Sequence, residues 1–276
     1  MPVHSDSESA VLSDDRLTLA AIAVLAFILA DVAHEVVGHG IGFFLAGGRS
    51  GILTTTRLIS QAGRLGDRGG LLFDMGGPCG NLGIAALALW SQRLLRRPAP
   101  RFRFLLWLVT TFSLFWAFGY LIFCGVVARG DWFALIQGSS HLWLGRVVLI
   151  AAGILLYRIS VRLTASELHW VVSSAGQPAG PRVRRLVLYG YVSGGLIACA
   201  GAIFDPRGAF EILNSGALSS FAAALGLLWV PRLFPSTPNK SVSTPLITRS
   251  PAWIVVGASV AIFFIAILGP GIPITL

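Results

Sequence analysis

The feature that most constrains this chain is a series of apolar runs, each about 20 residues long, separated by short polar segments. A helix of about 20 residues crosses the roughly 30 Å hydrocarbon core of a bilayer. The runs begin near Leu17, Gly70, Phe104, Leu142, Leu186, Ile212 and Ala252. The sequence therefore predicts an all-α, polytopic integral membrane protein with six or seven transmembrane helices. The count stays open because Arg146 and Arg158 lie within the fourth run.

Composition excludes a soluble single domain and a disordered chain. Only 12 % of the residues are charged and 55 % are hydrophobic, whereas a soluble domain is roughly one quarter charged. The net charge of +9 does not indicate a nucleic-acid partner, because the basic residues are scattered in short loops between apolar runs. Basic residues in such loops are typical of membrane proteins. We therefore expect the lipid bilayer as partner, no nucleic acid, and a location in the bacterial cytoplasmic membrane.

The runs divide the chain into three parts. Residues 1–16, rich in Ser and Asp, are expected to form a mobile N-terminal tail. Residues 17–135 contain the first three runs, which we interpret as a three-helix core. Within this core, the Thr- and Gly-rich stretch 47–69 predicts a short hairpin at the membrane interface, after the first helix. Residues 136–276 supply the additional transmembrane helices.

Four ionisable residues interrupt the first apolar run: Asp31, His34, Glu35 and His39. At 100° per residue they share an arc of about 140° on a straight α-helix. Ionisable side chains are costly in lipid, so this arc must face other helices, water or a metal ion. Neutral imidazole is a common zinc ligand, and a carboxylate beside a ligand can act as a general base. The pattern indicates a functional site.

The segment from His34 to His39 resembles the zinc signature H-E-x-x-H. The longer segment from His34 to Arg49 resembles the first active-site helix of site-2-protease-type intramembrane metalloproteases. The family's histidines are four residues apart, whereas these are five apart, about 140° around a straight helix. One π-helical turn would absorb the extra residue, and Gly38 would ease it. In the alternative arrangement, Glu35 and His39 face the metal and the general-base role is left unfilled.

A second element of that family, G-P-x-x-N, is similar to the segment from Gly77 to Asn81. In the family this element is implicated in substrate handling, so the resemblance implies that Gly77, Pro78 and Asn81 bind substrate. Gly-Pro is expected to break the helical hydrogen-bond ladder, and the Asn amide can hydrogen-bond an extended peptide. An ordinary kink with its satisfying amide is the alternative.

The third element of the family, N-P-x-P-x-x-x-L-D-G, supplies an aspartate ligand and is not present as written. Asp131 follows the third run, and antiparallel spans would bring it to the same side of the membrane as His39. Asp205, after the fifth run, is the other candidate, but Asp131 belongs to the contiguous three-helix unit. Asp31 is expected to orient a histidine without binding the metal.

The resemblance implies an intramembrane zinc metalloendopeptidase whose substrate is a membrane-spanning protein. His34, His39 and Asp131 would hold Zn²⁺, and Glu35 would deprotonate the attacking water. Two alternatives stay open. The unusual spacing suggests a non-proteolytic relative that binds membrane proteins, and the ionisable cluster suggests a proton-coupled transporter.

Overall fold

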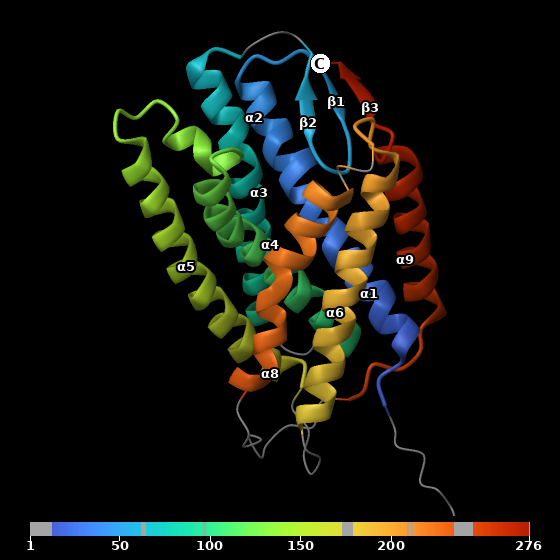
Figure 1. The fold of residues 1–276 in the computed structure, drawn as a ribbon. Coiled ribbons are helices and arrows are strands. Elements are labelled where there is room, and N and C mark those ends of the chain that lie inside the picture. Colours follow the sequence, from blue (N-terminus) through green and yellow to red (C-terminus); the bar gives the residue numbers. More distant parts are fainter. Residues whose placement is uncertain are drawn as a thin grey trace, which may run out of the picture.

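The computed structural model describes residues 13–61, 65–95, 98–172, 179–208, 210, 212–234 and 245–275. Within these ranges the chain is a bundle of long helices with a small sheet at one end (Figure 1). Six of the described helices are long and apolar enough to cross a membrane. They cover Arg16–Leu45, Arg68–Leu94, Pro100–Val127, Leu142–Trp170, Ala179–Phe204 and Pro251–Leu268. The predicted all-α polytopic membrane fold is confirmed.

Most spans contain one long α-helix, and several end in a π- or 3₁₀-helical segment. The elements of the first three spans and the following loop are α1 (Arg16–Val32), the π-helix η1 (Ala33–His39), α2 (Gly40–Leu45), α3 (Asp67–Leu94), α4 (Pro100–Val127) and the 3₁₀-helix η2 (Asp131–Leu135). The next two spans consist of α5 (Leu142–Glu167), η3 (Leu168–Trp170), α6 (Ala179–Gly201) and η4 (Ala202–Phe204).

The run that begins near Ile212 is helical but irregular. It changes from the π-helix η5 (Ile212–Ala222) to the 3₁₀-helix η6 (Ala223–Trp229) and then to α8 (Val230–Leu233). Its apolar helix, Ser220–Leu233, is shorter than a membrane span. The final span consists of α9 (Pro251–Phe263) and the π-helix η7 (Phe264–Leu268).

The predicted hairpin is present as β1 (Ser50–Leu53) and β2 (Leu58–Ser60). A third strand, β3 (Ile272–Thr275), comes from the C-terminal end and pairs antiparallel with β1, giving the order β2-β1-β3. The turn of the hairpin is fixed to the bundle because the Thr55 hydroxyl donates to the Gly201 carbonyl at 2.9 Å. The hairpin is therefore joined both to α6 and to the C-terminal strand.

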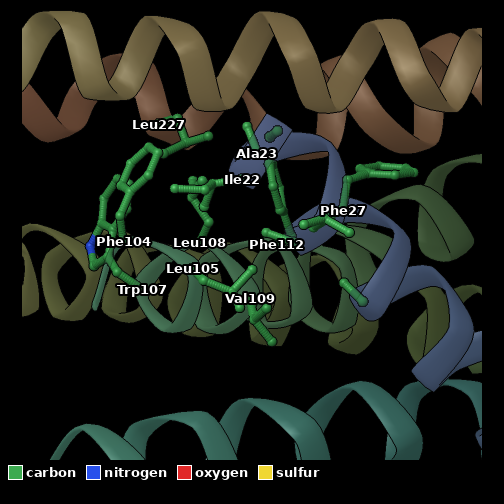
Figure 2. Close-up of a cluster of buried hydrophobic side chains, with 14 of the residues drawn as sticks. Ile22, Ala23, Phe27, Phe104, Leu105, Trp107, Leu108, Val109, Phe112 and Leu227 are labelled. Atoms are coloured by element: carbon green, nitrogen blue, oxygen red, sulfur yellow. The ribbon is translucent and has the colours of Figure 1, made fainter. Parts of the chain in front are cut away.

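Helix α1 lies inside the bundle and packs against α4, α6 and α9. Its Ile22, Ala23 and Phe27 side chains interlock with apolar side chains of α4 (Figure 2). Phe27 makes an edge contact with Trp116, with ring centroids 5.1 Å apart. Since dispersion and close packing dominate helix association in lipid, these contacts hold the first span at the centre. Its ionisable residues thereby face the interior of the bundle.

The predicted mobile tail is wrong for its last residues, while residues 1–12 lie outside the described part of the chain. Asp14 is buried, and its two carboxylate oxygens accept hydrogen bonds from Arg182 at 2.9 and 3.0 Å. Asp15 caps α1 by accepting the Thr18 backbone N–H at 2.9 Å. Because these carboxylates have specific partners, the segment directly before α1 is held in place at Asp14 and Asp15.

Glycines allow α3 to lie directly against the π-helix η1. A Cβ added at Gly38 would collide with the Gly76 carbonyl oxygen, and one added at Gly80 would collide with the Ala33 carbonyl oxygen. Small residues allow this backbone approach between transmembrane helices. The helix α3 also continues through Pro78, so the predicted break is absent, in keeping with the tolerance of transmembrane helices for proline.

The substitution Gly80→Ala should lower the free energy of unfolding by about 1–3 kcal/mol, because the added methyl group forces α3 away from η1. The matched control is Gly83→Ala on the same helix, where a Cβ would meet nothing within 4 Å. Denaturation of the detergent-purified variants measures the difference. Equal stability of the two variants would contradict the close approach.

Candidate metal centre

The π-helix η1 brings the two histidines of the first span side by side. Its wider turn, with i→i+5 hydrogen bonds, absorbs the fifth residue between His34 and His39. Their ring centroids lie 4.8 Å apart, with the ring planes nearly perpendicular. The predicted π-helical distortion is confirmed, and the straight helix that would separate the two side chains by about 140° is not formed.

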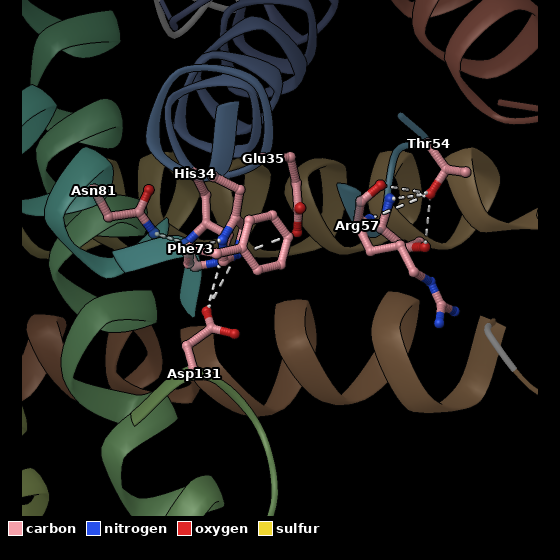
Figure 3. Close-up of polar contacts among 9 residues, drawn as sticks. His34, Glu35, Thr54, Arg57, Phe73, Asn81 and Asp131 are labelled. Carbon is pink, nitrogen blue, oxygen red and sulfur yellow. Dashed lines mark hydrogen bonds and ion pairs between the residues drawn. The ribbon is translucent and has the colours of Figure 1, made fainter. Parts of the chain in front are cut away.

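Asp131 completes a three-residue cluster with these histidines (Figure 3). Its Oδ2 atom lies 3.1 Å from His34 Nε2 and 3.4 Å from His39 Nε2. One ligand atom from each residue lies within 4.8 Å of the others. The other candidate, Asp205, lies elsewhere: its carboxylate accepts the Thr56 hydroxyl at 2.7 Å. The structure thus brings together the set that contains Asp131.

The loop after α4 positions Asp131. Gly130 has φ of +96°, a conformation that favours glycine, and a Cβ there would also lie 2.6 Å from the Tyr120 hydroxyl. The next residue, Trp132, donates its indole N–H to the Ala117 carbonyl at 2.8 Å. The backbone on one side of Asp131 and the side chain on the other are therefore fixed against α4.

The electrostatic surroundings favour the carboxylate form of Asp131. Burial raises the pKa of Asp131, but the adjacent imidazoles of His34 and His39 lower this pKa by more than burial raises it. The pKa of Asp131 is therefore well below its usual range. A negatively charged oxygen is the form that binds metal ions.

Helix α3 provides the outer contacts of both imidazoles. His39 Nδ1 donates to the Phe73 carbonyl at 2.8 Å. The fully buried Asn81 amide lies 3.3 Å from His34 Nδ1. In this contact Asn81 Nδ2 donates to His34 Nδ1; if the amide is rotated by 180°, Oδ1 accepts Nδ1–H instead. Asn81 Oδ1 has no hydrogen-bond partner among the described residues. Such outer contacts set the tautomer of a metal-binding histidine.

These contacts leave both Nε2 atoms facing Asp131, and the pairing of His39 with Asp131 requires a positive charge. When His39 is neutral and donates through Nδ1, its Nε2 carries a lone pair that faces a carboxylate oxygen. Either a proton or a metal ion must lie between them. In a tetrahedral zinc site with bonds of about 2.0 Å, neighbouring ligand atoms are about 3.3 Å apart. The two separations that involve Asp131, 3.1 and 3.4 Å, fit that geometry, and the ligand atoms of all three residues lie within 4.8 Å of one another.

Glu35 lies beside this cluster. Its Oε1 atom is 4.0 Å from His34 Nε2, and its buried Oε2 atom has no hydrogen-bond partner among the described residues. A cavity of about 680 Å³ opens onto Glu35 and all three residues of the cluster. The alternative pairing of Glu35 with His39 as metal ligands, with His34 excluded, is not the arrangement that forms, because His34 Nε2 is the imidazole atom closest to Asp131.

The remaining predicted site residues occupy different places. A Cβ at Gly77 would lie 2.5 Å from His34 Nε2 and 2.6 Å from His39 Nε2, so Gly77 backs both rings. Asn81 contacts His34, and neither Pro78 nor Asn81 lines the cavity. Asp31 lines the cavity but contacts neither imidazole, because the four ring nitrogens face Asp131, Phe73 and Asn81. The contacts that orient the imidazoles, which were expected from Asp31, come from α3 instead.

Sequence reasoning missed the outer partner of His39 and the residues that position Asp131. Phe73 acts through its backbone carbonyl, which carries no sequence signal. Gly130 could have been found, since a glycine directly before a candidate ligand is typical of a special backbone conformation.

Comparison with known proteins gave no match to a family model, to a curated protein or to a solved structure.

The variant Asn81→Leu should weaken zinc binding about 10- to 100-fold, because His34 loses the partner that fixes its tautomer and ring orientation. The matched control is Gln92→Leu, which removes another buried amide of α3 that lies outside the cluster and the cavity. Competition with a zinc chelator measures both affinities. An unchanged affinity in Asn81→Leu would show that the amide does not support His34.

Proposed function

We propose that this chain is an intramembrane zinc metalloendopeptidase of the bacterial cytoplasmic membrane that hydrolyses peptide bonds of membrane-spanning proteins. The observation that carries the proposal is the convergence of His34, His39 and Asp131 beside Glu35, on the wall of one cavity. Two imidazoles, one carboxylate and a free coordination position are typical of catalytic zinc sites. The resemblance of the sequence to site-2-protease-type enzymes supports the same assignment.

His34, His39 and Asp131 would hold the zinc ion. When bound, zinc supplies Lewis-acid activation of a water molecule and of the scissile carbonyl. Glu35 would accept the proton of the attacking water and deliver it to the leaving amide nitrogen, as a general base and then a general acid. Its 4.0 Å distance from His34 Nε2 puts the carboxylate close to the site without making it a ligand.

The cavity suits a peptide in an unwound conformation. Its wall includes the turn and second strand of the hairpin, with Thr55, Arg57 and Leu58, and aromatic side chains such as Phe73 and Tyr120. Cavities of 300–1,000 Å³ with apolar walls and a few convergent polar groups are the usual binding sites of proteins. A volume of about 680 Å³ accommodates several residues around a scissile bond.

The five-residue spacing between His34 and His39 suggests the non-proteolytic alternative, but the π-helix η1 absorbs the extra residue. The spacing is therefore compatible with a three-ligand site. The proton-coupled transporter has no specific observation in its favour.

The variant Glu35→Gln should keep its zinc and lose about 10²- to 10⁴-fold in cleavage rate, because the amide cannot accept a proton. The matched control, Glu167→Gln, changes a buried carboxylate near Arg93 that lies outside the cavity. Wild type and both variants are incubated in liposomes with a library of membrane-spanning peptides, and products are identified by mass spectrometry. Cleavage that survives in Glu35→Gln would reject its role.

A further inference from the structure

Asp31 is a buried carboxyl group that the proposed mechanism does not use. The residue is 5 % exposed and lies on the wall of the cavity, one helical turn before Glu35. Its carboxyl group makes no hydrogen bond or ion pair with any residue that the structure describes. A buried polar group without a partner typically costs about 1–3 kcal/mol. Because Asp31 lines the cavity, a polar group that enters the cavity can pair with its carboxyl group.

The position of Asp31 along the span makes a hydrogen-bond partner within the cavity more important. It lies midway along Arg16–Leu45, about 22 Å from the first residue at 1.5 Å per residue. At this depth water is scarce, and an ionisable residue inside the bilayer is a functional candidate by default. Asp31 lines the cavity, which gives a polar group access to its carboxyl group.

The surroundings of Asp31 are aromatic on the side away from Glu35. Phe27 and Trp116 both line the cavity, and their rings contact each other at 5.1 Å. Trp116 also lies 5.9 Å from the His34 ring, which connects this end of the cavity to the metal-ligand cluster. Among the described residues, three arginines line the cavity: Arg57 and Arg207 are near Asp205, and Arg129 lies in the loop after α4, directly before Gly130. This end of the cavity thus places the Asp31 carboxyl group beside aromatic side chains.

We propose that Asp31 determines specificity by binding a neutral, hydrogen-bond-donating side chain of the substrate, namely Asn, Gln, Ser or Thr. This inference rests on the proposed peptidase function. A carboxyl group accepts a hydrogen bond in either protonation state, whereas a lysine or arginine partner would add the desolvation of a second charge. The substrate residue that Asp31 binds would lie near the scissile bond, on the side toward the middle of the membrane.

Binding of paired peptides tests the proposal without requiring cleavage. The protein is the full-length Glu35→Gln variant in detergent, and the probes are fluorescent membrane-spanning peptides in which Asn replaces Leu at one position at a time. At one position, Asn should strengthen binding about 5- to 10-fold over Leu. The variant Asp31→Leu should remove this preference, and Asp31→Asn, which keeps an acceptor oxygen, should retain most of it.

The control variant is Leu29→Ala, on the same helix but 40 % exposed on the outside of the bundle, and it should keep the full preference. If Asp31→Leu does not fold, Asp31→Ala removes the acceptor with a smaller side chain. An Asn preference that persists without Asp31, or an equal loss of affinity for both peptides, would overturn the proposal. If only the peptidase assignment is wrong, the Glu35→Gln protein still prefers Asn at that position and loses the preference with Asp31→Leu, while the wild type cleaves none of the peptides.

Discussion

The arrangement of the candidate site depends on the direct contact between the π-helix η1 and helix α3. Gly38 on one side, and Gly76 and Gly80 on the other, let the two backbones touch. This contact brings the Phe73 carbonyl and the Asn81 amide within reach of the two imidazoles. A side chain larger than hydrogen at these positions would move α3 away and remove both outer partners. The close packing of these glycines is therefore required for the hydrogen-bonding contacts of the two imidazoles.

A cluster of ionisable residues within an apolar helix is stable only when other parts of the protein surround it. Here α1 occupies the centre of the bundle, with α4, α6 and α9 against it. The loop after α4 adds Asp131, and the irregular helices η5 and η6 complete the cavity wall through Leu218 and Ala223. The helices after residue 136 are thus more than an appendage to a three-helix core, because they line the same cavity.

Much of the fold and of the cluster could be predicted from the sequence, since apolar run length and side-chain cost in lipid act locally. The π-helical turn followed from the spacing of His34 and His39 alone. Long-range pairings could not be predicted: β3 joins β1 across more than 200 residues, and Asp14 finds Arg182 in α6. The role of Asn81 was also out of reach, because its contact with His34 depends on how closely α3 approaches η1.

The central claim is that His34 and His39, although five residues apart, bind one metal ion with Asp131. The most direct test is the zinc content of detergent-purified protein by elemental mass spectrometry, comparing wild type with His39→Ala. The control is His141→Ala, an exposed histidine directly before α5. The account predicts about one zinc ion per chain in wild type and in the control, and loss of zinc in His39→Ala. Zinc-free wild type, or zinc retained without His39, would contradict it.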